Sequence, residues 1–543
     1  MGFIITFFFL QLVSLPAILL AQEINFANIV VNGTATIGET DDNYICATID
    51  WFPSDTCRYN YCMLQNSSAI TLDLSNPLLA KAIQAFRNLR LRIGGSPQDQ
   101  VIYNVGSPRY PCHPFQQARD GSLFGLTTGC LYMWRWDELN QFFNKTGAIV
   151  TFGLNALYGR KKQETSILWV GDWDPSNTEA LMNYTILKGY QIDSWEFGNE
   201  LSGRGIGARV EAAQYAKDVI NLKKNMNELY RKSNYKSNYK PKLVAPGGFF
   251  DQSWYTQLLQ DSGSGIVDIV THHIYNLGAG NDPNLISKIL DPSYLSNSIL
   301  GTFRNIEGMI QEHGPWASIW VGESGGAFQG GGRHVSDRFV NSFWYLDQLG
   351  MAAKYNTKVY CRQTLVGANY ALLNRTTMEP NPDYYSALLW HRLMGKRVLE
   401  VHGLDASPYL RPYAHCSKGR VGVTLLLINL SNQTNFIINV YNHTNIKLKE
   451  KEKRRGESPF MCSLKAKVGS NGESLMREEY HLSPEDGNLR SQTSLLNGNP
   501  LNVSNGELPR LDPIFCEEHT PIYVAPLSIA FIVIPNFEAP ACA

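Results

Sequence analysis

Between residues 45 and 395, eight short β-rich runs alternate with amphipathic stretches typical of helices. The runs are residues 45–50, 89–95, 148–156, 192–200, 242–248, 267–275, 318–326 and 358–367. The helical stretches are residues 78–88, 135–144, 177–189, 210–231, 253–261, 298–313, 335–355 and 383–395. Such alternation predicts a parallel sheet, because parallel neighbours are joined by a crossover helix. Eight units favour an α/β fold of the closed (β/α)8 TIM-barrel type.

An open doubly wound sheet that binds a dinucleotide is the alternative architecture. It requires a glycine-rich turn after its first strand, so that the backbone can approach a pyrophosphate. Here the first run continues into Asp50-Trp51-Phe52-Pro53, which cannot form such a turn. The barrel is therefore preferred, and no cofactor is expected.

The sequence pattern changes after residue 395, where long helical stretches give way to alternating runs separated by Gly, Asn and Pro. This pattern predicts a C-terminal β-sandwich module over residues 396–543. Residues 22–40 are also strand-like and precede the barrel of residues 41–395. We expect this early segment to pair with the module.

Several features favour the secretory pathway. Residues 1–21 are almost wholly apolar and predict a signal peptide removed after Ala21, with an N-terminal anchor as the alternative. Ten cysteines fit a set of disulfides, although Cys361 lies in an apolar run and is expected to be a free buried thiol. Asn-x-Ser/Thr glycosylation sites occur at Asn32, Asn66, Asn144, Asn183, Asn374, Asn429, Asn432, Asn442 and Asn502. The expected location is extracellular, in the cell wall, with the vacuole, the lysosome or a peripheral membrane association as alternatives.

The charge balance excludes one class of function. The formal net charge is +0 and charged residues make up 18% of the chain, which argues against a basic nucleic-acid binder. The chain has no Cys-x-x-Cys pair, which argues against a zinc site of that type. Adjacent His272 and His273 on a strand would point to opposite faces, so no metal site is expected from them.

Two glutamates lie where barrel enzymes carry their chemistry, at the carboxyl ends of strands. The fourth run ends at Glu200, and the seventh run passes through Glu323. Two carboxylates that face one cavity can hydrolyse a glycosidic bond, one as proton donor and the other as nucleophile. Asn199 beside Glu200 provides an amide for a sugar hydroxyl, so we assign Glu200 as acid/base and Glu323 as nucleophile. Glu196 lies deeper in its strand and is expected to be a structural charge facing Arg90 or Arg92.

The motifs around these residues resemble glycoside hydrolase family 79, the family of the heparanases and related β-glucuronidases, and above all its plant heparanase-like members. The resemblance is carried by Trp-Glu-Phe-Gly-Asn-Glu at 195–200, His-His-Ile-Tyr at 272–275, Gly-Glu-Ser-Gly-Gly-Ala at 322–327 and Cys-Arg-Gln at 361–363. It covers nearly the whole chain after the signal peptide. It implies the same roles for Glu200 and Glu323 and a disulfide between Cys416 and Cys542.

The resemblance also implies a subsite for a uronic acid. Tyr370 and the backbone amides of residues 330–332 would bind the sugar carboxylate, with Gly330 and Gly331 as the main donors. The other implied substrate-binding residues are Asp50, Ser96, Asn199, His273, Tyr275 and Gln363.

These inferences predict a secreted retaining glycosidase whose partner is a glucuronic-acid-containing carbohydrate. Removal of terminal glucuronic acid, for example from arabinogalactan-type glycoproteins, is the first expectation. Endo-cleavage of an acidic polysaccharide is the second, and a non-catalytic glycan-binding protein is the alternative of another class. The nearest basic cluster is residues 160–162, expected as a solvated loop. The oligomeric state is left open.

Overall fold

The computed structural model describes residues 23–53, 65–118, 122–233, 240–404, 407–443, 462–463 and 476–543. The predicted signal peptide and the cysteines Cys57 and Cys62 lie outside these ranges. Within them, no helix combines the length and apolar composition needed to cross a bilayer.

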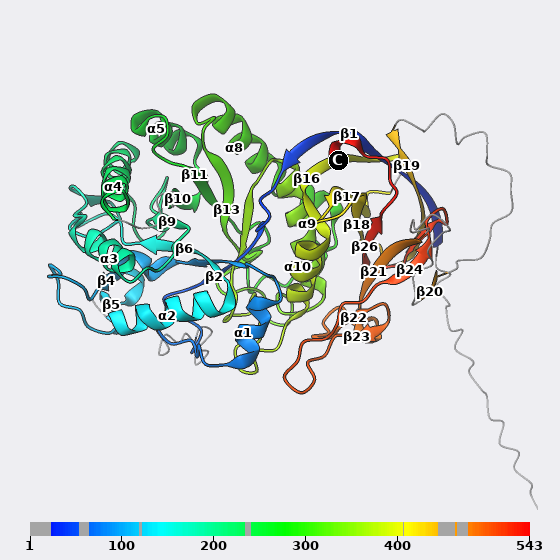
Figure 1. The fold of residues 1–543 in the computed structure, drawn as a ribbon, viewed down its shortest axis with the longest axis horizontal. Helices are drawn as coiled ribbons and strands as arrows, with labels where there is room; N and C mark the ends of the chain where they lie inside the picture. The colour runs from blue at the N-terminus through cyan, green and yellow to red at the C-terminus, as the bar shows by residue number, and fades with distance from the viewer. Residues whose placement is uncertain are drawn as a thin grey trace, which may run out of the picture.

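Eight parallel strands close into a barrel, as predicted (Figure 1). Around the barrel they are β2 (Ile45–Ile49), β3 (Arg90–Ile93), β6 (Ile149–Leu154), β9 (Ser194–Phe197), β10 (Lys242–Phe249), β11 (Ile269–Ile274), β13 (Ser318–Ser324) and β15 (Val359–Arg362). Short accessory pairs are β4 (Val101–Tyr103) with β5 (Gly129–Leu131), β7 (Lys161–Lys162) with β8 (Trp169–Val170), and β12 (Gly278–Ala279) with β14 (Ala327–Phe328). Each predicted barrel strand is present in its predicted interval.

Helices surround the barrel, because each strand presents one apolar face outward. They are α1 (Pro77–Gln84), α2 (Met133–Thr146), α3 (Ser176–Leu187), α4 (Ala212–Lys232), α5 (Gln252–Ser262), α6 (Leu285–Ile289), α7 (Pro292–Asn297), α8 (Leu300–His313), α9 (Val340–Lys354) and α10 (Pro382–Leu393). Helices α9 and α10 lie between the barrel and the C-terminal module (Figure 1). This explains why α9 is buried almost all round.

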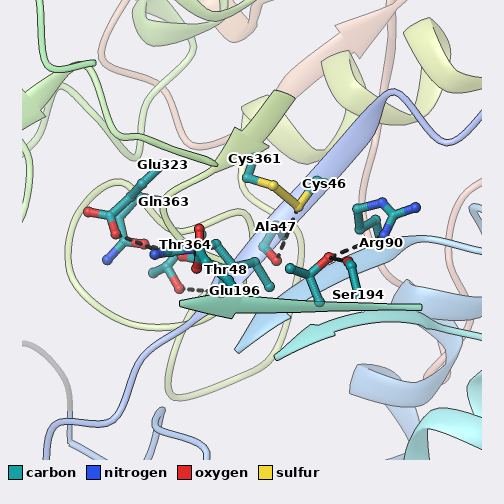
Figure 2. Close-up of a disulfide and its surroundings, with 12 residues drawn as sticks. Cys46, Ala47, Thr48, Arg90, Ser194, Glu196, Glu323, Cys361, Gln363 and Thr364 are labelled. Carbon is teal, nitrogen blue, oxygen red and sulfur yellow. Dashed lines mark hydrogen bonds and ion pairs between the residues drawn. A yellow bond between two sulfur atoms is a disulfide. The ribbon is translucent and has the colours of Figure 1, made fainter. Parts of the chain in front are cut away.

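Alternate strand residues point into the barrel. Six of the barrel-strand residues form a separate buried cluster: Cys46, Val244, Ile269, Trp320, Val359 and Cys361. Cys46 and Cys361 lie opposite each other on β2 and β15 and form a disulfide, so the prediction of a free thiol at Cys361 was wrong. The bridge joins the first and last strands of the barrel, at the point where the sheet closes. Figure 2 shows it between Arg90 on one side and Glu323 on the other.

The residues after the barrel form a β-rich module, as predicted, and its 12 strands are hydrogen-bonded into one curled mixed sheet. The strands are β16 (Met394–Leu404), β17 (Leu410–Ser417), β18 (Val423–Asn429), β19 (Thr434–Asn442), β20 (Cys462–Ser463), β21 (Met476–Pro484), β22 (Ser494–Leu496), β23 (Asn499–Pro500), β24 (Ile514–Glu517), β25 (Ile522–Val524) and β26 (Ser528–Ile534), together with the early β1 (Glu23–Glu39). β1 lies between β16 and β19, pairing antiparallel with the first and parallel with the second (Figure 1).

Both faces of this sheet are buried in its central strands. In β18, Leu426 and Ile428 pack into the large core shared with the barrel helices, whereas Leu425 and Leu427 pack into the module's own core. At the junction, the buried Asp347 of α9 accepts side-chain hydrogen bonds from Arg411 and Tyr413 of β17. The barrel and the module therefore share a continuous apolar core, and the ion pair of Asp347 and Arg411 also joins them.

Three further disulfides occur in the described ranges. Cys112 pairs with Cys130, Cys462 pairs with Cys516, and Cys416 pairs with Cys542. All described cysteines are therefore paired.

One predicted glycosylation site is buried. The Asn429 side chain is fully enclosed, and its amide donates to the carbonyls of Thr434 and Ala525, each at 2.8 Å. This leaves no space for a glycan at Asn429 in the folded chain. The other eight sites are exposed or half-buried.

Candidate active site

Glu200 and Glu323 lie together at the carboxyl end of the barrel. Glu323 belongs to β13, and Glu200 follows β9 by three residues with a left-handed backbone (φ 55°). The Glu200 amide donates a 2.7 Å hydrogen bond to the carbonyl of Gly247, which holds this turn against β10. A side-chain oxygen of each glutamate lies within 4.8 Å of the other, and each residue is 7% exposed. The structure thus brings the two predicted carboxylates to one point.

Glu323 is held as an anion. One of its oxygens accepts a 2.6 Å hydrogen bond from the hydroxyl of Tyr275, and the other lies 2.9 Å from Nη1 of Arg92. Burial alone would raise the pKa of Glu323, but electrostatic interactions with His273 and with the Arg92 cation, together with these hydrogen bonds, lower the pKa below its usual value. An ionised carboxylate at this position suits a nucleophile.

Arg92 connects the site to the barrel interior. Its Nε donates to Glu196 at 2.6 Å and its Nη2 donates to the side chain of Asn199 at 2.8 Å. Of the two arginines that the sequence offered to Glu196, the structure selects Arg92 for the direct pair. Burial opposes the charge on Arg92, but Glu196 and Glu323 outweigh it and raise the arginine's pKa. The guanidinium therefore fixes Glu323 and Asn199 in one geometry.

The two histidines of β11 point to opposite faces, as strand alternation requires. Nδ1 of His273 lies 2.9 Å from the Glu200 carboxylate, so His273 belongs to the site. His272 faces α8, where its ring lies 6.0 Å from that of Phe303. Burial and the neighbouring His273 lower the pKa of His272 to about 3, so it is a neutral core residue.

The same cluster has the spacing of a metal site. One ligand atom each from Glu200, His273 and Glu323 lies within 4.8 Å of the others. The positive charge of Arg92, 2.9 Å from Glu323, opposes a divalent cation at this point. The donor set therefore fits a metal ion poorly.

A third carboxyl group, that of Asp50, lies beside the pair at the end of β2. Burial and the nearby charge of Glu323 raise the pKa of Asp50 to about 7, against hydrogen bonds from the Trp51 amide and Gln363. The Gln363 amide donates to Asp50 at 3.3 Å and its carbonyl accepts from Thr48. Asp50 and Gln363 are thus neighbours in one hydrogen-bonded group.

Gly95 lets the chain pass close to this group. A Cβ on Gly95 would lie 2.7 Å from Oδ2 of Asp50, and the residue has φ +120°. Only glycine suits both the space and the backbone conformation. Ser96 follows it, half-buried, at the start of a short 3-10 helix, Ser96–Gln100.

Tyr370 is packed against the glycine-rich loop after Glu323. A Cβ on Gly325 would lie 2.7 Å from the Tyr370 ring, and one on Gly331 would lie 3.1 Å from it. Asn369 holds this loop, since its amide donates to the carbonyl of Gly330 at 2.8 Å and its side chain donates to that of Gly331 at 3.1 Å. Burial and the charges of Glu323 and Asp50 raise the pKa of Tyr370, so its hydroxyl remains a donor.

One predicted anion donor is already engaged. The amide of Gly332 donates to Oγ of Ser336 at 2.9 Å, whereas the prediction for residues 330–332 placed it on a substrate carboxylate. Ser336 lies four residues after Gly332, and no sequence pattern indicated that its hydroxyl would accept this hydrogen bond.

Asp99 is a site residue that the sequence analysis missed. Its carboxyl group accepts the backbone amides of Asn199 and Ala156, each at 2.8 Å, and so holds the turn that carries Glu200. Burial raises the pKa of Asp99 to about 7, against these two hydrogen bonds. Its position four residues after Gly95, in the segment that follows the second strand, was the only sequence feature that could have indicated this role.

Comparisons with known proteins identify the family. Residues 26–350 match the model described as "Glycosyl hydrolase family 79, N-terminal domain". The chain is 57% identical to Heparanase-like protein 1 of Arabidopsis thaliana, with 100% of both chains covered. It is 36% identical to Baicalin-beta-D-glucuronidase of Scutellaria baicalensis, over 92% of this chain and 90% of that one.

A solved structure with the same fold is a 4-O-alpha-L-rhamnosyl-beta-D-glucuronidase from Fusarium oxysporum. It has a TM-score of 0.59 and 15% identity and covers 94% of this chain and 100% of its own. At that identity the likeness shows the fold alone. Together with the family match and the full-length relatives, these findings show that the chain belongs to glycosyl hydrolase family 79, as a glycoside hydrolase of the β-glucuronidase and heparanase-like group.

Proposed function

We propose that the protein is a secreted retaining β-glucuronidase that removes terminal glucuronic acid from glycans or glycosides. The observation that carries this proposal is the approach of Glu200 and Glu323, whose oxygens come within 4.8 Å at the barrel mouth. Retaining enzymes place their two carboxyl groups about 5–5.5 Å apart, whereas inverting enzymes need room for a water between them. The short approach supports double displacement.

The two carboxylates have different environments, which supports different roles. Arg92 and Tyr275 hold Glu323 ionised, ready to attack the anomeric carbon. Glu200 instead contacts His273, through which a proton can be exchanged. Glu200 first protonates the glycosidic oxygen and then removes a proton from the water that hydrolyses the glycosyl–Glu323 intermediate.

The environment of Tyr370 supports a uronic acid as the sugar at the reacting centre. Its hydroxyl is a donor, and it packs against the loop of Gly330 and Gly331, whose amides can approach an anion. Asp50, with a pKa of about 7, is protonated in mildly acidic solution and then adds no charge that would repel the substrate carboxylate.

Exo action is preferred to endo action on an acidic polymer. The nearest basic cluster offers little to a polyanion, because Arg160 is buried and binds Asp218, leaving only Lys161 and Lys162 exposed. The four disulfides among the described residues and the exposed glycosylation sites support an extracellular location such as the cell wall.

The test uses an aryl β-glucuronide and a glucuronic-acid-bearing polymer with the native chain, Glu200→Gln and Glu323→Gln. We expect turnover of the aryl glucuronide by the native chain and a loss of about a thousand-fold or more in each variant. Glutamine preserves the shape of glutamate, so circular dichroism provides the folding control. Undiminished turnover in both variants would refute the site, and a non-catalytic glycan-binding protein would turn over no substrate. Oligosaccharides released from the interior of the polymer would show endo action instead.

A further inference from the structure

Phe249 is an apolar side chain left partly exposed at the mouth of the barrel. It is the last residue of β10, and 39% of its surface is exposed. It lies opposite His273 in the register between β10 and β11. Because paired residues of neighbouring strands point to the same face, Phe249 faces the cavity, as His273 does.

The phenyl ring lies beside two residues that contact the catalytic carboxylates. Its centroid is 6.4 Å from that of His273, which contacts Glu200, and 6.3 Å from that of Tyr275, which donates to Glu323. A half-exposed aromatic ring at this place is available to a bound molecule.

The backbone ties Phe249 to the Glu200 side of the site. A Cβ on the preceding Gly248 would lie 3.3 Å from the Cα of Glu200, so the two segments touch. The hydroxyl of Ser202 donates to the carbonyl of Phe249 at 3.4 Å. A second exposed apolar residue, Ile206, donates its amide to the carbonyl of Glu200 at 3.0 Å and is 44% exposed.

The chemistry of the reaction indicates on which side of the site the leaving group lies. A general acid protonates the glycosidic oxygen, and the leaving group is the part of the substrate attached beyond that oxygen. The leaving group therefore lies against the residues that surround the acid. If Glu200 is the acid, these residues include Phe249 and Ile206.

We infer that Phe249 forms the stacking surface of a leaving-group subsite. This inference rests on the proposed roles of Glu200 and Glu323. The subsite takes leaving groups that present a flat apolar face, either an aromatic ring or the less polar face of a sugar ring. A leaving group without such a face gains nothing from Phe249.

The test compares kcat/KM for three β-glucuronides whose leaving groups are 4-nitrophenol, galactose and methanol. In Phe249→Ala we expect kcat/KM for the nitrophenyl glucuronide to fall about ten-fold, in line with the loss of one aromatic contact. The methyl glucuronide should change by less than about two-fold. A fall for the galactosyl substrate as well would assign the site to sugar faces, and its absence would restrict it to aromatic groups. Phe249→Trp should keep the preference for the nitrophenyl substrate.

The matched control is Phe26→Ala, the same chemical change at a residue of β1 that is 65% exposed on the module, away from the barrel mouth. It should leave all three values unchanged. Equal losses for methyl and nitrophenyl substrates in Phe249→Ala, or no loss for either, would overturn the inference while the proposed function stands. Absence of turnover of every glucuronide by the native chain would overturn both.

Discussion

The guanidinium of Arg92 lies 2.9 Å from the carboxylate of Glu323, where Arg92 is 1% exposed and Glu323 is 7% exposed. The same guanidinium binds Glu196 at 2.6 Å, so one cation serves two buried anions. A buried charge that loses its partner is destabilised far more than an exposed one. The ionised state of Glu323 therefore depends on Arg92.

Replacement of Arg92 by methionine should move the acidic limb of the pH profile to higher pH. Arg92 holds the pKa of Glu323 down, so without it Glu323 is protonated, and inactive as a nucleophile, at pH values where the native enzyme works. We expect kcat/KM to fall by about a hundred-fold or more in mildly acidic solution, with partial recovery as the pH rises. The measurement is kcat/KM against pH for an aryl glucuronide.

The control for this change is Arg92→Met combined with Glu196→Gln, which removes the other unpaired buried charge. The double variant should regain folding stability but keep the shifted pH profile. An acidic limb at the native position in both variants would contradict the role of Arg92.

Ionisation of Asp50 should weaken substrate binding on the alkaline side of the pH profile. Its pKa of about 7 means that it ionises as the pH rises through neutrality, placing a second negative charge beside Glu323 and the substrate carboxylate. We expect KM for a glucuronide to rise across this range in the native enzyme, and to stay flat in Asp50→Asn. Michaelis constants measured at a series of pH values decide this.

The same shift has a consequence for stability. In the unfolded chain Asp50 ionises near its ordinary pKa of 3.8, whereas in the folded chain it keeps its proton until about pH 7. Above 3.8 the unfolded state therefore binds fewer protons, and stability falls as the pH rises toward 7. The free energy of unfolding of the native protein should decline relative to Asp50→Asn over this window. A parallel course for the two proteins would show that Asp50 is not shifted.

The disulfide that closes the barrel should stabilise the fold without serving the chemistry. Cys46 and Cys361 are 315 residues apart and join β2 to β15, and Figure 2 shows the bridge to one side of Glu323. Their joint replacement by alanine should cost about 2–5 kcal/mol of unfolding free energy, the usual range for a native disulfide. Denaturant midpoints measure the loss, and kcat at room temperature should stay near the native value.

A suitable comparison is the joint replacement of Cys462 and Cys516, which are bridged within the module. That bridge closes a separation of only 54 residues and should stabilise less, because a shorter loop removes less entropy from the unfolded chain. A Cys46/Cys361 variant as stable as the native protein would contradict the assigned role of the barrel bridge.

The sequence predicted the barrel well because each strand carries its own local signal. The alternation of strand and helix can be detected within short windows of sequence. Glu200 and Glu323 could be chosen as candidates from their positions at strand ends alone. What it missed are contacts between distant segments. Cys361 looked unpaired because Cys46 lies on a strand that meets it only when the barrel closes.

The same limit applies within the site. Glu196 could be matched to an arginine but not to a particular one, because Arg90 and Arg92 point to the same face of β3. The sequence at Asn429 matches the glycosylation pattern, but folding encloses its side-chain amide, which the pattern alone could not indicate. Phe249 had no motif at all, and its exposure beside His273 became visible only in three dimensions.

The central claim is that Glu323 attacks the sugar while Glu200 handles the proton. The most direct measurement is mass spectrometry of the protein after reaction with a 2-fluoro glucuronosyl fluoride, a substrate analogue whose glycosyl–enzyme intermediate breaks down slowly. The account predicts one added 2-deoxy-2-fluoroglucuronosyl group, formed with release of the anomeric fluoride and located on the peptide that contains Glu323. A label on Glu200 or on another residue, or hydrolysis with inversion and no label, would contradict it.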